Sequence, residues 1–127
     1  MMTLSQAEQI HKILIDQFGG SHGIRDHGTL LSALSRPFQT FDGKDLYPSA
    51  IQKAAAFIES ILINHPFIDG NKRTGYVLMR LLLIENGLDI DASQEDKYQF
   101  VIRIASGKFN FNDIIHWLEH HTRTNNS

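Results

Sequence analysis

The sequence contains no cysteine, which excludes disulfides, thiolate metal sites and cysteine nucleophiles. It also lacks a long apolar run: the most apolar stretch, residues 76–83, is interrupted by Arg80 and is too short to cross a bilayer. No apolar core follows a basic start at the N-terminus, so we expect no signal peptide, no membrane association and a cytoplasmic location. The net charge of −2 argues against broad electrostatic capture of nucleic acid, and no direct nucleic-acid binding is expected.

What the chain does contain is enough apolar material for a core. It has 127 residues, of which 42% are hydrophobic, and it shows no internal repeat and no low-complexity segment. We therefore expect one domain over residues 1–127, with a polar and frayed tail from about residue 121.

Apolar residues recur at helical spacing along most of the chain, which predicts an all-α fold of six helices. The first helix is expected to begin at Ser5 through a Ser5–Glu8 capping box. The second is expected to turn Leu30, Leu31 and Leu34 inward. The predicted helices cover residues 5–18, 26–35, 48–64, 71–86 and 93–106, and a last one is capped by Asn110 or Asn112.

The two middle helices are predicted to form the buried centre of the domain. Pro48 suits the first position of one of them, and Pro66 disfavours helical geometry at His65 and so ends it near residue 64. The next helix is apolar almost all round, as a central helix is. Before this pair, residues 38–47 place β-forming residues on both sides of Asp42-Gly43, which favours a short hairpin flap about as strongly as an irregular loop.

Between the two central helices lies a cluster of functional side chains, His65 to Arg73. The helix start at Gly70 and Asn71 offers backbone N–H groups to an anion, and Lys72 and Arg73 add charge there that a phosphate ligand would balance. The sequence therefore predicts a phosphate-handling site. In it Asp69 either caps the helix or binds Mg²⁺, and His65 takes a proton from a hydroxyl.

Simpler interpretations of these residues remain open. His65 can be a loop histidine bonded to the backbone, Phe67 a core residue, and Lys72 with Arg73 a solvated helix edge. A Walker A loop fails, because Gly75 is followed by Tyr-Val and not by Lys-Ser/Thr. A zinc site is weak, because the remaining histidines lack ligand spacing.

The stretch HPFIDGNKR, residues 65–73, closely resembles the Fic motif H-P-F-x-[D/E]-G-N-[G/K]-R. The lysine form, continuing as NKRTG, resembles the Doc (death-on-curing) branch of the Fic/Doc superfamily. The resemblance extends to FGGSHGIRDHGTLLSALSRP at residues 18–37, DLYPSAIQKAAAFIESILINHPF at residues 45–67 and LLLIENG at residues 81–87.

This resemblance implies an all-α Fic/Doc fold built around a central helical hairpin, with ATP or another nucleotide and Mg²⁺ bound at the motif. It implies that His65 is the general base, that Asp69 is the metal ligand and that the flap aligns a target peptide. It also implies a catalytic and nucleotide-binding set consisting of His65, Asp69, Gly70, Asn71, Lys72 and Arg73.

The Doc branch implies a toxin that phosphorylates a Ser or Thr of translation elongation factor Tu and arrests translation. Its partner would be a small antitoxin. Pro66 and Gly70 match the Fic motif, whereas the founding Doc sequence is looser at both positions. AMP transfer therefore remains the alternative, and Lys72 alone does not decide between phosphorylation and AMP transfer. An inactive binding module is a third possibility. The only Glu-Asn pair, Glu85-Asn86, has Leu81 four residues earlier and lacks the self-inhibitory pattern, so inhibition is expected from the antitoxin.

Overall fold

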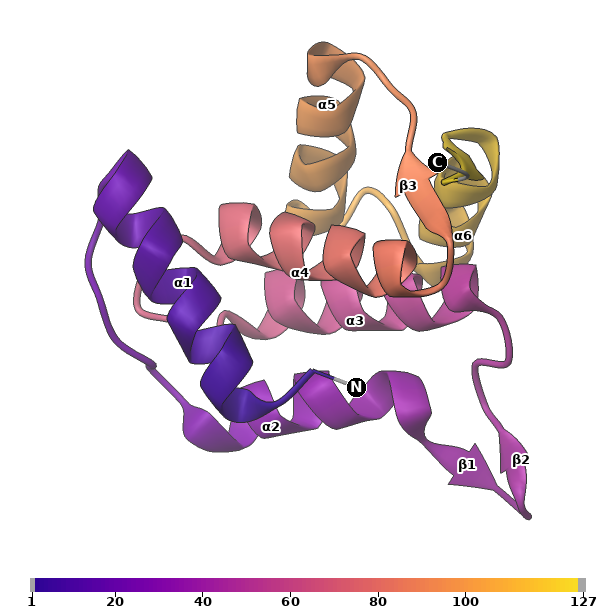
Figure 1. Cartoon of the computed structure of the whole chain (residues 1–127), viewed down its shortest axis with the longest axis horizontal. Helices are drawn as coiled ribbons and strands as arrows, with labels where there is room; N and C mark the ends of the chain where they lie inside the picture. Colours follow the sequence, from indigo (N-terminus) through magenta and orange to yellow (C-terminus); the bar gives the residue numbers. More distant parts are fainter. Residues whose placement is uncertain (1, 126–127) are drawn as a thin grey trace.

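A computed structural model of the chain describes residues 2–125 and shows six α-helices, of which α3 and α4 lie side by side at the centre and the other four pack around them (Figure 1). This confirms the predicted all-α class and its central helical hairpin. The helices are α1 (Leu4–Phe18), α2 (His27–Ser35), α3 (Ala50–Asn64), α4 (Asn71–Glu85), α5 (Gln94–Ala105) and α6 (Phe111–His120), with a short 3₁₀ helix η1 (Arg36–Phe38) after α2.

The first helix begins at Leu4, one residue earlier than predicted. Thr3, and not Ser5, is the N-cap: its hydroxyl accepts from the Gln6 N–H at 3.1 Å, and the Gln6 side chain accepts from the Thr3 N–H at 2.9 Å. Both T-x-x-Q and S-x-x-E match the capping pattern, and the earlier start adds Leu4 to a helix that buries Ala7 completely.

The start of α3 also differs from the prediction by two residues. Ser49 is the N-cap, and it forms a reciprocal capping box with Gln52. Pro48 therefore precedes the cap and does not occupy the first helical position. The serine side chain can satisfy a free backbone N–H of the first turn, which proline cannot do, so the cap falls on Ser49.

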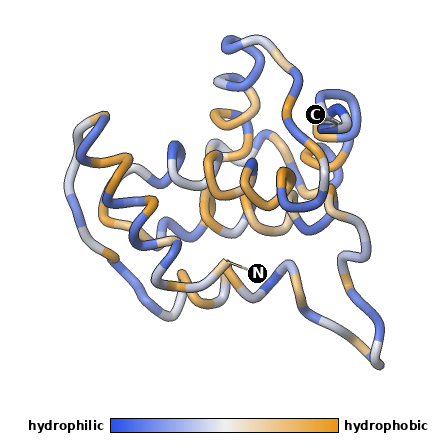
Figure 2. The backbone as a smooth tube through the Cα atoms, in the orientation of Figure 1, coloured by the Kyte–Doolittle hydropathy of each residue, from blue (hydrophilic) through white to orange (hydrophobic). Residues whose placement is uncertain are grey.

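Apolar side chains from all six helices meet around α3 and α4, where the backbone is coloured most strongly hydrophobic (Figure 2). In α3, Ala54, Ala55 and Ile58 are fully buried. The prediction for α2 was correct at Leu30 and Leu34 but wrong at Leu31, which is 50% exposed. A short helix presents only one face to the core: Leu30, Ala33 and Leu34 share that face and are buried, whereas Leu31 points away from it.

The predicted flap is a hairpin. β1 (Thr40–Phe41) pairs antiparallel with β2 (Lys44–Asp45), with Phe41 opposite Lys44. Both turn residues have positive φ, 54° at Asp42 and 76° at Gly43, which is the geometry that favours Asp-Gly in two-residue hairpins. The hairpin projects from the body of the molecule beside the start of α3 (Figure 1).

A second small sheet corrects the prediction of a frayed tail. β4 (Thr122–Thr124) pairs antiparallel with β3 (Leu88–Ile90), and the Asn125 N–H donates to the Gly87 carbonyl at 2.7 Å. Threonine is a good strand former, so this polar tail can pair with the edge of β3. The last two residues of the predicted tail lie outside the described part. Within residues 2–125 no helix is long and apolar enough to span a bilayer.

Candidate active site

The loop between α3 and α4 begins with His65 in a left-handed conformation, φ 49° and ψ 62°. Its N–H still donates to the Ile61 carbonyl, so His65 closes the last turn of α3. Pro66 disfavours a right-handed helical backbone at the residue before it, and the left-handed conformation that His65 adopts costs a non-glycine residue about 1–2 kcal/mol. The chain therefore turns abruptly at His65, and its side chain leaves the helix axis.

The next residues are held by a reciprocal pair of hydrogen bonds between Phe67 and Asn71. The Asn71 amide oxygen accepts from the Phe67 N–H at 2.9 Å, and its NH₂ donates to the Phe67 carbonyl at 2.9 Å. Phe67 is 1% exposed, as predicted for a core residue. The side chain of Asn71 thus fixes the loop, whereas its backbone N–H lies at the start of α4.

That start differs from the other helix starts in the described chain. The N-cap of α4 is Gly70, in a left-handed conformation and without a side-chain hydrogen bond, whereas side chains cap the other five helices. The N–H groups of residues 71–73 have no intrahelical acceptor, so they favour an anion. A Cβ on Gly70 would lie 3.0 Å from the Ile15 Cδ1 atom, so the close approach of α1 also favours glycine here.

Asp69 is held from three sides although its side chain is exposed. Oδ1 accepts from the Gly70 N–H at 2.8 Å, Oδ2 accepts from the Ser21 N–H at 3.1 Å, and the Asp69 carbonyl oxygen lies 2.8 Å from His11 Nε2. A Cβ on Gly20 would lie 2.8 Å from Oδ2, so the loop after α1 can approach the carboxylate only without a side chain at that position. The carboxylate is therefore oriented before any ligand binds.

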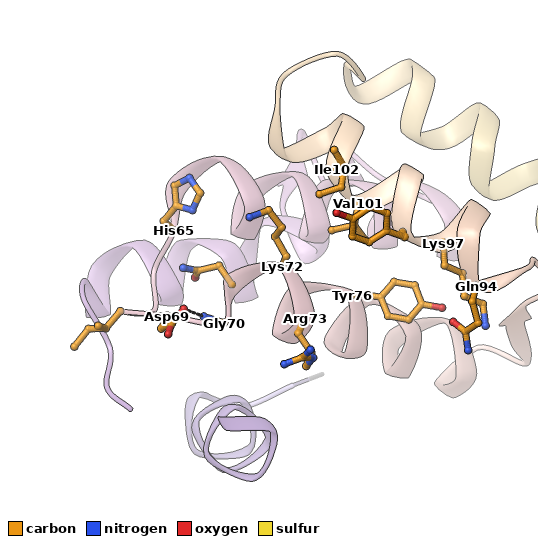
Figure 3. A pocket seen from close by; sticks show the side chains of 13 residues that line it. His65, Asp69, Gly70, Lys72, Arg73, Tyr76, Gln94, Lys97, Val101 and Ile102 are labelled. Carbon is orange, nitrogen blue, oxygen red and sulfur yellow. Dashed lines mark hydrogen bonds between the residues drawn. The ribbon is translucent and has the colours of Figure 1, made fainter. Parts of the chain in front are cut away.

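Three cations line the pocket at this helix start: Lys72 and Arg73 from the first turn of α4, and Lys97 from α5, which lies farther away, near Tyr76 (Figure 3). None of them forms an ion pair within residues 2–125. The Arg73 guanidinium lies 4.3 Å from the centroid of the Phe18 ring, at the end of α1. Unpaired cations next to free N–H groups indicate a binding site for a multiply charged anion.

His65, Asp69, the start of α4 and these three cations line one pocket of about 590 Å³ (Figure 3). All six residues of the predicted set line this pocket: His65, Asp69, Gly70, Asn71, Lys72 and Arg73. The opposite wall comes from α5 and α4, through Val101, Ile102 and the ring of Tyr76. The Tyr76 hydroxyl is buried without a partner among residues 2–125, and this burial raises the pKa of Tyr76 and keeps it protonated.

Asp69 is the one acidic residue of the described chain that lines this pocket and could contribute to a metal site. Residues 2–125 contain no group of three or more His, Asp or Glu side chains that could enclose a metal by themselves. Mg²⁺ usually takes one or two carboxylates, several waters and substrate phosphates, and the exposed Asp69 carboxylate fits that mode. The imidazole of His65 makes no hydrogen bond within residues 2–125, so it is free to accept a proton.

Several residues that contact this site lie far from the motif in the sequence and were not predicted. His11, Ser21 and Arg25 contact the motif loop, and Lys97 lines its pocket. The one available signal was the glycine-rich segment after α1, where Gly20 and Gly23 have φ values of 115° and 118°. Glycines in that conformation indicate a close backbone approach, but they do not indicate to which residue.

Comparison with known proteins gives two findings. The model of the Fic/DOC family matches residues 1–83, which include the flap, α3 and the motif loop. A protein of Mycolicibacterium smegmatis named Toxin Doc is 43% identical over 75 residues. That alignment covers 59% of this chain and 58% of the relative, so the chain matches less than two thirds of the relative's length.

Proposed function

The chain belongs to the Fic/DOC family, and from that premise we propose that it is a nucleotide-dependent transferase which phosphorylates a Ser or Thr hydroxyl of a protein. One observation carries the proposal. The free imidazole of His65, the oriented carboxylate of Asp69 and the uncapped, cation-flanked start of α4 all face the same pocket.

In the proposed step, the neutral imidazole of His65 takes the proton of the target hydroxyl. The hydroxyl oxygen forms a bond to the γ-phosphorus of ATP while the bond from that phosphorus to the bridging oxygen breaks, and ADP leaves with the electron pair. The N–H groups of residues 71–73, with Lys72 and Arg73, stabilise the charge on the phosphoryl oxygens. Positioning and electrostatics supply most of the rate in such transfers.

Magnesium, held by Asp69 and the nucleotide phosphates, would supply further neutralisation of phosphate charge. The flap is the proposed guide for the target, because its strands are exposed and β1 offers an edge to an extended peptide. The proposed target of the enzyme is elongation factor Tu, and phosphorylation of this factor would arrest translation. The similarity to Toxin Doc supports a toxin that a small antitoxin silences.

AMP transfer to the same hydroxyl is the alternative. Gly70 in its left-handed conformation and Pro66 match the motif of AMP-transferring relatives, and the pocket residues would be the same. In that case the α-phosphorus is attacked and pyrophosphate leaves. A binding module without catalysis is the third candidate, and it requires no chemistry from His65.

Incubation of the protein with a cell extract and ATP labelled separately at the α- and γ-phosphates distinguishes the three. We expect γ-label on one protein band, no label with His65→Ala, and normal labelling with His116→Ala, a matched change at an exposed histidine on α6. Transfer of α-label would establish AMP transfer instead. Toxicity that persists in His65→Ala without any labelling would establish the binding module.

The antitoxin is tested separately. Expression of the chain alone should stop growth, and expression together with the product of its neighbouring gene should restore it. Equal growth arrest in both cases would contradict silencing by a partner encoded beside this chain.

A further inference from the structure

The segment after α1 runs antiparallel to the motif loop and binds its backbone. Ile24 forms a β-bridge with Phe67, the Ile68 N–H donates to the Gly23 carbonyl at 3.0 Å, and the Arg25 N–H donates to the Pro66 carbonyl at 2.8 Å. The two stretches are about forty residues apart in the sequence, so this pairing is a tertiary contact that α1 and α2 hold in place.

Arg25 adds its side chain to this pairing at the end of α3. Its Nε donates to the His65 carbonyl at 2.7 Å, and its Nη2 donates to the Asn64 carbonyl at 2.5 Å. The last carbonyls of a helix lack intrahelical donors and carry partial negative charge, so a guanidinium with two donors is well matched to them. Arg25 does not line the pocket and is exposed.

The residue that Arg25 binds has an unfavourable backbone conformation. His65 has φ 49°, and such a conformation in a non-glycine residue persists only where neighbouring contacts enforce it. The backbone dihedrals of His65 set the direction of its Cα–Cβ bond and therefore the place of its imidazole in the pocket. From these contacts we infer that Arg25 is a positioning residue for His65, an inference that rests on the proposed role of His65 as the general base.

A positioning role predicts a defined kinetic effect. A base displaced by about 1 Å loses on the order of 100-fold in rate, while nucleotide phosphates bound by α4 are not affected. Arg25→Ala should therefore lower kcat about 10- to 100-fold and change KM for ATP less than about twofold. In a His65→Ala background the same substitution should have no further effect on transfer, so the double variant should match His65→Ala, because Arg25 acts through His65.

The experiment measures transfer of labelled phosphate by wild type, Arg25→Ala and a matched control, Arg80→Ala. Arg80 also donates through Nε and Nη2, at 2.8 and 3.0 Å to Asp89, and it lies outside the pocket. Arg80→Ala should lower Tm and leave kcat unchanged.

Chemical rescue provides a second test. Because the Arg25 contacts are exposed, guanidinium ion at millimolar concentration should restore activity to Arg25→Ala, and ammonium at equal ionic strength should not.

A second measurement separates this inference from the proposed function. In ¹³C,¹⁵N-labelled protein, the backbone shifts and the HN–Hα coupling of His65 report its left-handed conformation whether or not the protein transfers phosphate. If wild type transfers no label, the proposed function fails, and a shift of the His65 signals in Arg25→Ala but not in Arg80→Ala still supports the positional contact. Unchanged His65 signals in Arg25→Ala, or a kcat equal to that of wild type, would overturn the inference.

Discussion

The imidazole of His11 lies parallel to the ring of Phe67, with 4.1 Å between the centroids and 7° between the planes. Both side chains are buried, and His11 Nε2 lies 2.8 Å from the Asp69 carbonyl oxygen. A carbonyl only accepts, so this contact assigns the proton to Nε2. One side chain of α1 thus fixes both the core residue of the motif loop and the backbone of the proposed metal ligand.

Substitutions at His11 should separate its two contacts. His11→Phe can keep the stacking but leaves the Asp69 carbonyl without its donor, so we expect a loss of about 1–3 kcal/mol in the free energy of unfolding. His11→Ala also leaves a cavity, and the expected loss is about 3–5 kcal/mol, as for other buried rings. Urea unfolding measures both. The exposed His116→Phe change should stay within about 0.5 kcal/mol of wild type, and a fully stable His11→Phe would show that the Asp69 contact contributes nothing.

The parts of this protein that could be predicted from its sequence are those specified by neighbouring residues. Pro66 lies two residues after the end of α3, so the loop was predictable, and Asp42-Gly43 made a hairpin one of the two equally favoured structures for the flap. The six site residues were predicted to meet because they occupy nine positions at one helix start, and the structure places them in one pocket.

The contacts that were missed join segments far apart in the chain. His11, Arg25 and Lys97 reach the site through the packing of α1, the loop after it and α5, and no local pattern specifies such contacts. The start of α1 was predicted wrongly for a different reason: two overlapping capping patterns, at Thr3 and Ser5, compete, and packing decides between them. The β3–β4 pairing was missed because the strand propensity of the tail depends on a partner.

Acid should weaken the fold through the pair formed by Arg80 and Asp89. Hydrogen bonds from the Arg80 guanidinium lower the pKa of the buried Asp89 carboxyl to about 2, and the Ile90 N–H adds to the effect. A depressed pKa stabilises the fold at pH values above the unfolded pKa of about 4, and this stabilisation is lost as the pH falls from about 4 to about 2.

We expect the pair to contribute about 1–2 kcal/mol at neutral pH, less than the full shift implies, because Arg80 is 50% exposed and solvent screens it. Thermal unfolding measured from pH 2 to pH 7 gives the slope. Asp89→Asn cannot titrate, so its stability should fall less than that of wild type between pH 4 and pH 2. Parallel curves for the two proteins would contradict the assignment to Asp89.

The flap should affect the protein target and not the nucleotide. Phe41 is 74% exposed, so Phe41→Ala should change the free energy of unfolding by no more than about 0.5 kcal/mol. Loss of an exposed aromatic contact should still raise KM for the protein target about 10-fold or more, with KM for ATP unchanged. Phe41→Tyr retains the ring and should stay near wild type. A rise in KM for ATP instead would show that the flap belongs to the nucleotide site.

Lys72 is the residue that we propose to influence which group is transferred. It is exposed, lies in the first turn of α4, and contributes its amine to the pocket beside free backbone N–H groups. Lys72→Gly removes the charge and opens the backbone to phosphate, at a cost of about 0.5–1 kcal/mol in helix stability. We expect γ-transfer to fall and α-transfer to appear.

Lys72→Ala supplies the control, because it removes the amine but keeps a Cβ over the backbone and a good helix former in the first turn. It should lose γ-transfer without gaining α-transfer, so that only the glycine variant exchanges one product for the other. Both products are measured with α- and γ-labelled ATP on the same target. If the glycine and alanine variants both transfer the γ-phosphate as wild type does, the side chain of Lys72 does not select the phosphate.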